Sequence, residues 1–254
     1  MPDALTHRRV PPALIAAAGG GKRLLPMTAD RPKCMLEVGG EPILIHQIRA
    51  LQACGVSQIQ LIVGHGEESV RAACAALDHD GISFARNERH ATTNSLFSFG
   101  CTTLDPYPDG LLVLNSDVLF HPTLLRRLID NPRENVLLAD LRSRLGEEEM
   151  KICLDTDFRI RRISKLVDPL QAQAENLGVL KLGPETASRM LRLARADGAD
   201  TRLCWIPDAI DFLAGEIDFF ALGSGELPWI EIDYPHDLRR AREEIWPQIQ
   251  QGSI

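Results

Sequence analysis

The stretch LIAAAGGGKRLLPMTADRPKCMLEVGGEPILIHQI, residues 14–48, decides the fold of this chain. It overlaps an apolar run, ALIAA at 13–17, that is typical of a buried β-strand. The glycines Gly19, Gly20 and Gly21 follow this run directly. Because glycine has no Cβ, the backbone there can turn tightly and bring its N–H groups close to an anion. The stretch therefore predicts a strand followed by an anion-binding loop.

The spacing around these glycines differs from that of two common phosphate-binding motifs. It is not GxxxxGK[ST], because Arg23 follows the pair Gly21 and Lys22. It is not a GxGxxG loop that opens a helix, because Pro26 argues against a helix at that point. Lys22, Arg23 and Lys33 nevertheless place cationic side chains near the loop. A glycine-rich turn also occurs as a plain tight connection, so the loop alone does not identify a ligand.

Apolar and amphipathic segments alternate along the first half of the chain. Apolar runs at 59–64, 82–85 and 111–115 have the length of strands. The segments 42–55 and 67–77 carry apolar residues at helical spacing, and the first of them starts on a proline and stops at a glycine. Strands that alternate with helices predict an α/β fold with a largely parallel sheet covered by helices.

The pattern changes in the second half of the chain. The runs VLLAD, MKICLD, RIRRIS and LGVLKLG are strand-like and separated by turns, and helical patterns return at 184–196 and 235–246. We therefore expect a single domain over residues 1–254, with a Rossmann-like, mostly parallel central sheet flanked by helices. Within it we expect a flexible N-terminus at 1–12 and an antiparallel insertion at 135–183.

Composition limits the classes of partner. The chain has 254 residues, 44% of them hydrophobic, and a formal net charge of −7, so it offers no overall positive field to nucleic acid or to an anionic membrane. No apolar run approaches the roughly 20 residues that a membrane span requires. The six cysteines form no CxxC pair, and the apolar run at 13–18 is too short for a secretion signal. These features favour a cytoplasmic protein with reduced thiols.

The N-terminal stretch resembles the opening of the sugar-phosphate nucleotidyltransferase superfamily, in which a GxGxRL core is followed by a P-K-x-L-x-x-V-x-x-x-P block. The matching positions here are Gly19, Gly20, Gly21, Arg23, Leu24, Pro26, Pro32, Lys33, Leu36, Val38 and Pro42. The resemblance implies a fold of the nucleotide-diphospho-sugar transferase type.

The same resemblance implies roles for the residues of the loop. It assigns nucleotide binding to Ala17, Gly19, Gly20, Gly21 and Lys22. Arg23 would neutralise the β- and γ-phosphates of a nucleoside triphosphate and Lys33 its α-phosphate, which makes both candidate catalytic residues. Transfer of a nucleoside monophosphate depends on positioning and charge neutralisation, so cations at these positions suit the chemistry.

Two aspartates from distant parts of the chain are candidate metal ligands. Asp117 follows the run at 111–115, and Asp233 follows a short apolar run in WIEIDYPHDL. Ligands bind at the carboxyl ends of strands in open α/β sheets, and Mg²⁺ prefers carboxylate oxygens together with phosphate and water. Aspartates also cap helices, and Glu231 and Asp237 are alternative ligands. Asp117 and Asp233 match the metal-binding positions of the resembled family, which implies Mg²⁺ as the cofactor.

The segment RNERHATTNSLFSF, residues 86–99, resembles a pattern of the phosphocholine cytidylyltransferase-like group, N-x-x-Y-x-x-T-N-N-x-x-S-L, whose members activate choline phosphate, inositol phosphate and phosphonates with CTP. Asn87, Thr93, Asn94 and Ser98 match that pattern, whereas His90 and Ser95 depart from it. Short amide and hydroxyl side chains can read a pyrimidine edge or cap a helix. The resemblance implies that Thr93, Asn94 and Ser95 bind the nucleotide and that this nucleotide is CTP.

The string RIRRISKLVDPLQAQAENLGVLKL resembles the part of the family that holds the acceptor. In relatives a lysine meets the acceptor's phosphate and a glutamate lies beside the rest of the acceptor. This implies acceptor binding by Lys165 and Glu175, with Asn176 adjacent, although Ala174 replaces the usual glycine. Lys151 is a further acceptor-binding candidate, and an exposed strand lysine is the alternative interpretation.

We therefore expect a CTP-dependent cytidylyltransferase that transfers CMP to a small phosphonate or phosphorylated acceptor and releases pyrophosphate. Phosphonoformate, 2-aminoethylphosphonate and phosphocholine are the acceptor types that fit. Choline recognition normally uses an aromatic cage, for which Trp205 and Trp229 are the candidates. A compact anionic acceptor suits the scarcity of aromatic residues and a set of arginines that could also only solvate the surface. These are Arg142, Arg144, Arg161 and Arg162.

Two other functions fit parts of the same pattern. One is a sugar-1-phosphate uridylyl- or thymidylyltransferase, and the other is a non-catalytic nucleotide-binding regulator on the same fold. Charged residues at Arg23, Lys33, Asp117 and Asp233 argue against the regulator. The sequence leaves a homodimer open.

Overall fold

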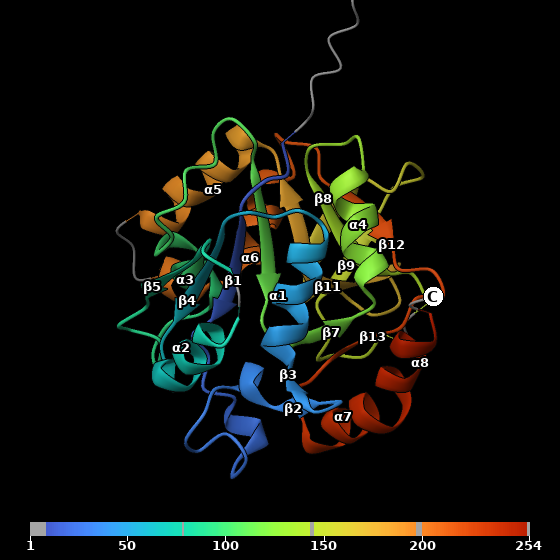
Figure 1. Cartoon of the computed structure of the whole chain (residues 1–254). Helices are drawn as coiled ribbons and strands as arrows, with labels where there is room; N and C mark the ends of the chain where they lie inside the picture. The colour runs from blue at the N-terminus through green and yellow to red at the C-terminus, as the bar shows by residue number, and fades with distance from the viewer. Residues whose placement is uncertain (1–8, 78, 143–144, 197–199, 253–254) are drawn as a thin grey trace, which may run out of the picture.

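The computed structural model describes residues 9–77, 79–142, 145–196 and 200–252. A large twisted sheet runs through this part of the molecule, with helices on both of its faces (Figure 1). The sheet contains β1 (Ala13–Ala17), β4 (Ile59–Val63), β5 (Ile82–Arg86), β6 (Leu111–Asn115), β8 (Val136–Asp140), β9 (Lys151–Leu154), β10 (Ile160–Ser164), β11 (Ala174–Leu182) and β12 (Phe220–Gly223). Its main order is β10-β9-β11-β6-β1-β4-β5, with β8 beside β11 and β12 beside β8.

The first half of the chain builds the parallel part of the sheet. β1 runs parallel to both of its neighbours, β4 and β6, and β5 runs parallel to β4. Almost every residue of β1, β4 and β6 is buried, as expected of parallel strands that are covered on both faces. The predicted strands of this half are confirmed, and their carboxyl ends meet at one edge of the sheet.

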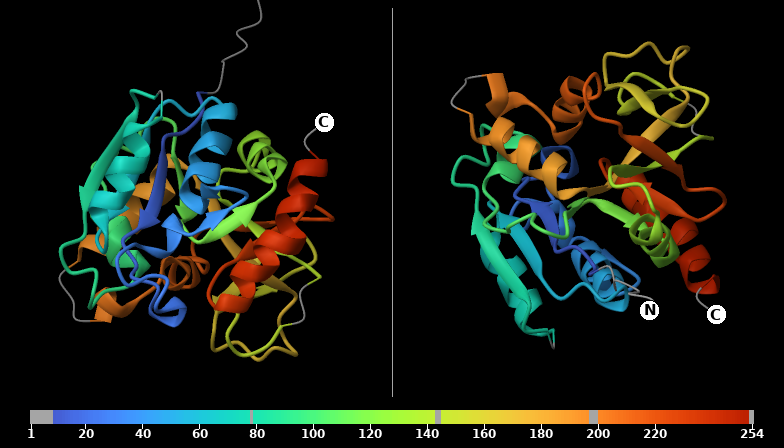
Figure 2. Two further views of the ribbon diagram at one scale, coloured as in Figure 1. Left: turned by 60° about the horizontal axis from the view of Figure 1, so that its bottom comes forward. Right: turned by 90° about the horizontal axis from the view of Figure 1, so that it is seen from above.

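Helices cover the two faces of the sheet with separate hydrophobic clusters. One face is covered by α1 (Ile43–Ala53), α2 (Glu67–Ala75) and α4 (Pro122–Asp130), and the other by α3 (Ser95–Gly100), α5 (Pro184–Arg195) and α6 (Ile206–Leu213). The view from above in Figure 2 shows this three-layer arrangement. The fold class expected from the sequence is confirmed.

The second half of the chain adds antiparallel strands to the parallel core. β11 runs antiparallel to β6, β8 and β9, and β10 runs antiparallel to β9. β12 is an exception, since it pairs with β8 in parallel. The strands expected between residues 135 and 183 are present, and they are part of the main sheet.

A smaller layer at the edge of the sheet combines distant segments. β7 (Val118–Phe120) pairs with β13 (Trp229–Glu231), and β2 (Glu37–Val38) pairs with β3 (Glu41–Pro42). α7 (Pro235–Arg240) continues through a π-helical turn into α8 (Trp246–Gln251), and a third hydrophobic cluster joins these pieces. The pairing of β7 with β13 places Asp117 next to the segment that carries Asp233.

The N-terminal segment is held against the sheet over its described part. Val10 packs on the hydrophobic cluster beside α1, and the carbonyl of Pro12 accepts a hydrogen bond of 2.9 Å from the Leu112 N–H. Residues 10–12 therefore differ from the flexible N-terminus expected at 1–12. Residues 1–8 of that segment lie outside the described residues.

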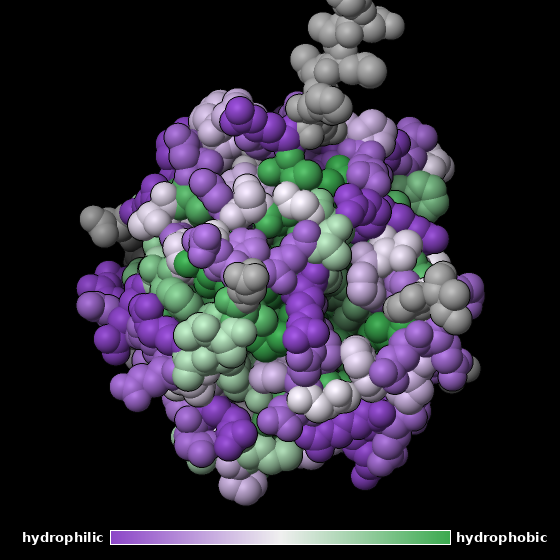
Figure 3. Space-filling view, in the orientation of Figure 1, coloured by the Kyte–Doolittle hydropathy of each residue, from purple (hydrophilic) through white to green (hydrophobic). Residues whose placement is uncertain are grey.

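Hydrophilic side chains cover much of the face seen in Figure 3, and hydrophobic ones are interspersed among them. None of the described helices combines the length and the apolar character that crossing a membrane would need.

A glycine in β11 shapes the strand that borders the carboxyl edge of β6. Gly178 has φ +73°, and the register between β11 and β8 shifts between Asn176 and Leu180. Its N–H donates to Asn176 Oδ1 at 3.1 Å, and a Cβ at this position would lie 2.4 Å from Asn115 Nδ2. A bulge of this kind, with glycine in the left-handed region, aims the neighbouring side chain away from the regular ladder.

Replacing Gly178 with alanine should lower the free energy of unfolding by about 1–3 kcal/mol, because the new methyl group meets Asn115 in a backbone conformation that disfavours side chains. Chemical denaturation measures this change. Gly215→Ala is the matched control, since a Cβ there meets no atom within 4 Å and should change stability little. Equal stability of the two variants would contradict the strained bulge.

Candidate active site

A cavity of about 660 Å³ opens at the carboxyl ends of β1 and β6, where ligands bind in open α/β sheets. Most of the residues that the sequence singled out come together in its lining. They are Gly19, Gly20, Gly21, Lys22, Arg23, Lys33, Thr93, Asn94, Ser95, Asp117, Lys165, Asn176 and Asp233.

Three carboxylates form a cluster in this cavity. Each of Asp117, Glu231 and Asp233 contributes one carboxylate oxygen, and these three oxygens lie within 4.8 Å of one another. The ribbon of β7 and β13 builds the cluster, since Glu231 pairs with Val118 and the Ile232 N–H donates to the Asp117 carbonyl at 3.0 Å. Both predicted metal ligands are therefore brought together, and Glu231 joins them.

Lys33 neutralises part of this cluster. Its Nζ lies 2.7 Å from Asp117 Oδ2 and also contacts a carboxylate oxygen of Asp233. Burial by itself lowers the pKa of Lys33, but the carboxylates of Asp117 and Asp233 outweigh burial and raise the pKa above its usual value. The amine therefore stays protonated and bound to the two aspartates.

Arg23 adds a second cation on the solvent side of the cluster. Its guanidinium lies 3.1 Å from Asp233 Oδ2 and 5.2 Å from the centre of the Tyr234 ring. Burial raises the pKa of Asp233, but the charges of Lys33 and Arg23 overcome this effect and lower the pKa below its usual value. Both predicted catalytic cations thus meet at Asp233.

Glu231 lies in a different electrostatic environment. Burial, together with the negative charges of Asp117 and Asp233, raises the pKa of Glu231 to about 8. A carboxyl group in such a site binds a proton near neutral pH unless a further cation is present.

The donor set fits a hard divalent cation. Asp117 Oδ1 is buried and has no hydrogen-bond partner among the described residues, so an oxygen of the cluster has an unfilled interaction. Once Glu231 is ionised, the three carboxylates carry more negative charge than Lys33 and Arg23 together balance. Oxygen ligands of this type suit Mg²⁺, which binds through one or two carboxylates plus phosphate and water.

Gln47 on α1 supports the turn that carries Asp117. Its Nε2 donates to the carbonyl of Asn115 at 2.8 Å and to the carbonyl of Val118 at 2.7 Å. These two carbonyls flank Asp117 on either side, so one buried amide fixes the direction of the turn. The sequence offered no signal for this role, because no motif distinguishes Gln47 from the other polar residues of α1, His46, Arg49 and Gln52.

The glycine loop turns through a left-handed residue. Gly21 has φ +60°, its carbonyl accepts a bond of 2.8 Å from the Thr28 hydroxyl, and the Leu24 N–H donates to the same carbonyl at 2.9 Å. A Cβ on Gly21 would lie 3.1 Å from the Lys33 side chain. Glycine at this position therefore lets the loop and Lys33 approach closely.

The nucleotide-binding segment predicted at residues 93–95 is tied to other parts of the cavity wall. The Asn94 side chain donates to the Leu203 carbonyl, and the Ser95 hydroxyl accepts a bond of 3.0 Å from the Ile206 N–H. The Thr93 hydroxyl donates to the Arg89 carbonyl at 3.0 Å. These side chains hold the wall in shape, and the structure places all three in the lining.

The residues predicted to bind the acceptor come from the antiparallel half of the chain. Lys165 Nζ lies 5.6 Å from the centre of the Trp205 ring, and both residues line the cavity with Asn176. Glu175 is not a lining residue, but its charge is close enough to contribute to the raised pKa of Glu231. Sequence reasoning missed Glu148, which also lines the cavity and which no motif marked.

Besides Glu175, two further predicted site residues lie outside the lining. Side chains alternate between the two faces of a strand. Ala17 therefore points into the hydrophobic cluster on the face covered by α1, whereas Ala16 and Ala18 line the cavity. Lys151 is fully buried, and its amine donates to the carbonyls of Gly146, Glu147 and Glu149 at 3.0–3.2 Å. The acceptor role expected for Lys151 is therefore wrong, since its amine stabilises the preceding loop.

The arginines that favoured an anionic acceptor pair with surface carboxylates. Arg142 pairs with Glu226 at 2.7 Å, Arg161 with Asp155 at 2.7 Å and Arg162 with Asp211 at 3.1 Å. None of these three lines the cavity, and Arg144 lies outside the described residues. Trp229 also lies elsewhere, with its Nε1 donating to Asp140 Oδ2 at 3.1 Å.

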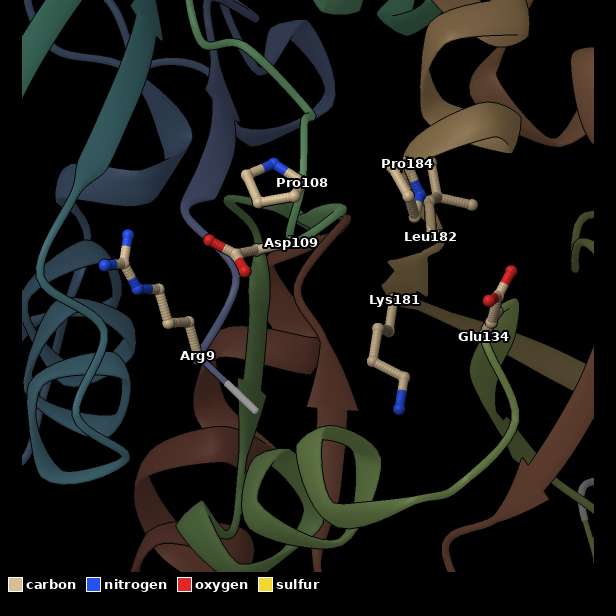
Figure 4. A pocket seen from close by; sticks show the side chains of 8 residues that line it. Arg9, Pro108, Asp109, Glu134, Lys181, Leu182 and Pro184 are labelled. Atoms are coloured by element: carbon tan, nitrogen blue, oxygen red, sulfur yellow. The ribbon is translucent and has the colours of Figure 1, made fainter. Parts of the chain in front are cut away.

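A second cavity, of about 410 Å³, opens near the amino end of β6 (Figure 4). Arg9, Asp109, Glu134 and Lys181 give it charges of both signs. The Lys181 amine donates to the carbonyls of Ile129 and Asn131, at the end of α4, and so stabilises that helix terminus. No motif residue lines this cavity, which makes the first cavity the candidate active site.

The matched family agrees with this location. The family model of the MobA-like NTP transferase domain matches residues 13–168, which include the glycine loop, Lys33 and Asp117. The chain belongs to this family. The nucleotidyltransferase family expected from the sequence is thereby confirmed.

Curated relatives cover the chain to different extents. It is 30% identical over its whole length to a CMP-5'-(3-aminopropyl)phosphonate synthase of Streptomyces rubellomurinus, of which it covers 41%. It is 28% identical, over 50% of its length, to a CTP:phosphoglutamine cytidylyltransferase of Campylobacter jejuni, of which it covers 52%. The chain thus spans about half or less of the length of these relatives.

Solved structures share the fold. An inositol-1-phosphate CTP transferase from T. maritima superposes with a TM-score of 0.79 at 22% identity, over 95% of this chain and 96% of that one. A CTP:phosphocholine cytidylyltransferase from Streptococcus pneumoniae gives a TM-score of 0.73 at 22% identity, over 91% and 97% of the two chains.

The raised pKa of Glu231 predicts a pH dependence of stability. Folding raises this pKa from 4.5 to about 8, so the folded state binds the proton more tightly than the unfolded state does, and the resulting stabilisation is lost as the pH rises through this range. Glu231→Gln should therefore show a smaller fall in the free energy of unfolding than the unchanged protein between about pH 5 and pH 8. Denaturant titrations across this pH range measure the difference.

The exposed residue Glu226 provides the control, since Glu226→Gln should leave the pH profile unchanged. Parallel profiles for the unchanged protein and Glu231→Gln would contradict the buried, proton-binding state of Glu231.

Proposed function

We propose that this protein is a Mg²⁺-dependent cytidylyltransferase, which transfers CMP from CTP to a small phosphonate or phosphorylated acceptor. One observation carries the proposal: a single cavity is lined by the glycine loop with Arg23 and Lys33, by Asp117 and Asp233, and by Lys165. Groups suited to a triphosphate, a divalent cation and a second anion thus share one site.

The proposed reaction forms one P–O bond and breaks another. An oxygen of the acceptor's phosphonate or phosphate attacks the α-phosphorus of CTP, the bond between the α-phosphorus and the bridging oxygen to the β-phosphate breaks, and pyrophosphate leaves with the electron pair. The acceptor oxygen is already ionised near neutral pH, so the reaction requires no general base. The protein's task is to bring two anions together and to neutralise their charge.

The cations of the cavity divide this task. Lys33 and Arg23 are bound to carboxylates in the structure, and a triphosphate would compete for both. Mg²⁺ held by Asp117 and Asp233 would withdraw charge from the phosphates and stabilise the leaving pyrophosphate. A cation there would also balance the carboxylates and free the Lys33 amine to contact the α-phosphate. Lys165, on the opposite half of the chain, would hold the acceptor's anionic group.

CTP is favoured over other triphosphates by the names of the relatives. The two relatives and the two superposed structures described above are named for CTP or for a CMP product, whereas other structures of this fold are named for thymidylyl transfer or for UDP-glucose. The segment around Thr93 and Asn94, whose resemblance pointed to CTP, lies in the cavity wall.

The lining near Lys165 favours an acceptor that carries an amine. Trp205 lies beside Lys165, and Glu148 lines the same cavity 3.6 Å from Arg23; a carboxylate and an aromatic ring in one cavity suit an ammonium group. The described arginines Arg142, Arg161 and Arg162 pair with carboxylates elsewhere, so they no longer support the preference for a compact anionic acceptor. The whole-length relative, named for a product with a 3-aminopropyl group, also supports an aminoalkylphosphonate.

Pyrophosphate release should require CTP, Mg²⁺ and an acceptor together. We expect the highest kcat/KM with CTP and 2-aminoethylphosphonate or its propyl homologue, when five triphosphates are crossed with aminoalkylphosphonates, phosphocholine, phosphonoformate and hexose 1-phosphates. Highest turnover of UTP or dTTP with a hexose 1-phosphate would instead establish a sugar-1-phosphate nucleotidyltransferase. Nucleotide binding without turnover of any pair would favour the non-catalytic regulator.

Asp117→Asn should reduce turnover by about 10²-fold or more at saturating Mg²⁺, because it removes one charge from the proposed cation site. The isosteric amide should leave the fold intact, which circular dichroism and thermal unfolding check. Asp157→Asn is the matched control on an exposed turn and should keep full activity. Full activity of Asp117→Asn would disprove the metal assignment.

A further inference from the structure

We propose that the Ser98 hydroxyl reads the base of the bound nucleotide by donating its proton to N3 of cytosine, and that Asn87 fixes the direction of this donation. The inference rests on the proposed cytidylyltransferase function. It assigns a specificity-determining role to Ser98 and a positioning role to Asn87.

The orientation of the Asn87 amide is fixed by a backbone group. Asn87 is 1% exposed, and its Oδ1 accepts a bond of 2.9 Å from the Arg89 N–H, which can only donate. The Nδ2 group must therefore face the other way. Its two N–H groups donate to Thr93 Oγ1 and to Ser98 Oγ, each at 3.0 Å.

Both hydroxyl groups accept from Asn87, so each retains its own proton for a different partner. Thr93 uses its proton in the bond to the Arg89 carbonyl at 3.0 Å. The Ser98 hydroxyl, in contrast, donates no hydrogen bond to any of the described residues. Ser98 is 6% exposed and lines the cavity, so its proton is available to a ligand there.

The position of Ser98 suits the base. The groups suited to phosphates, Gly19–Gly21, Lys33 and Asp117, follow the ends of β1 and β6, whereas Ser98 lies on α3 beside the wall formed by Asn94. Ala16, at the same cavity, has only a methyl side chain and leaves room for a flat ring. The ribose separates the base from the phosphates, so a group on α3 can face the ring while the glycine loop holds the phosphates.

The direction of the hydrogen bond distinguishes the two pyrimidines. N3 of cytosine carries a lone pair and accepts a hydrogen bond, whereas N3 of uracil carries a proton and donates one. A hydroxyl that already accepts from Asn87 is oriented as a donor, which matches cytosine and leaves uracil N3–H facing a second donor. On this inference, the protein selects CTP over UTP because the Ser98 hydroxyl is oriented as a donor, and not because the cavity excludes uracil by size.

The test compares kcat/KM for CTP, UTP and 3-deaza-CTP, which lacks the N3 acceptor. The unchanged protein should use 3-deaza-CTP about tenfold less efficiently than CTP, the size expected for one lost hydrogen bond. Ser98→Ala should lose about tenfold with CTP, use UTP at least as well as the unchanged protein does, and use CTP and 3-deaza-CTP equally well. Ser69→Ala, the same change on α2 outside the nucleotide cavity, is the control.

Asn87→Asp tests the positioning role. A carboxylate can only accept, so the Ser98 hydroxyl would donate to it and turn its lone pairs towards the cavity. The kcat/KM ratio of UTP to CTP should then rise above that of the unchanged protein, an outcome that simple loosening of the fold does not produce. Thermal unfolding checks that the variant is folded, and Asn87→Ser, a neutral polar replacement, serves if it is not.

The outcomes separate this inference from the proposed function. If the unchanged protein transfers CMP but Ser98→Ala affects CTP, UTP and 3-deaza-CTP equally, the cytosine contact is wrong and the cytidylyltransferase stands. If no triphosphate supports transfer by the unchanged protein, the proposed function itself fails.

Discussion

The ion pair between Lys33 and the two aspartates, Asp117 and Asp233, is the interaction on which the cavity depends. Carboxylates gathered within 4.8 Å repel one another, and a buried cation offsets this repulsion. The pair also joins three regions of the chain, since Lys33 follows the glycine loop, Asp117 follows β6 and Asp233 follows β13. The same contact shows how the site can respond to substrate. Under the proposed function, a divalent cation would replace Lys33 as the partner of the aspartates, and a triphosphate would bind the freed Lys33 amine.

Much of the fold could be predicted from the sequence, because local patterns encode it. Buried parallel strands leave near-continuous apolar runs, and a proline and a glycine marked the start and end of the α1 segment. Pairing across long distances has no such signal. The contact between β7 and β13 joins residues more than 100 positions apart, and it is this pairing that adds Glu231 to the acidic cluster. Because this pairing has no local signal in the sequence, Glu231 could be named only as an alternative ligand.

The incorrect site predictions share a physical cause. A sequence shows that a charged residue is present but not where its side chain ends. Lys151 lies in a strand that suggested an exposed amine, yet its side chain turns back onto three loop carbonyls. Arg142, Arg161 and Arg162 form pairs with carboxylates that are distant in the sequence or on a neighbouring turn. Arg23 and Lys33, which a long motif and not their charge identified, do line the cavity.

One short segment connects the two halves of the cavity. The carbonyls of Arg202 and Cys204 accept bonds from the N–H groups of Asn94 and Leu96, at 2.9 and 3.2 Å, so the segment is fastened to the start of α3. The next residue, Trp205, lies beneath the Lys165 amine. The wall assigned to the nucleotide and the platform of the acceptor lysine are therefore parts of one hydrogen-bonded unit.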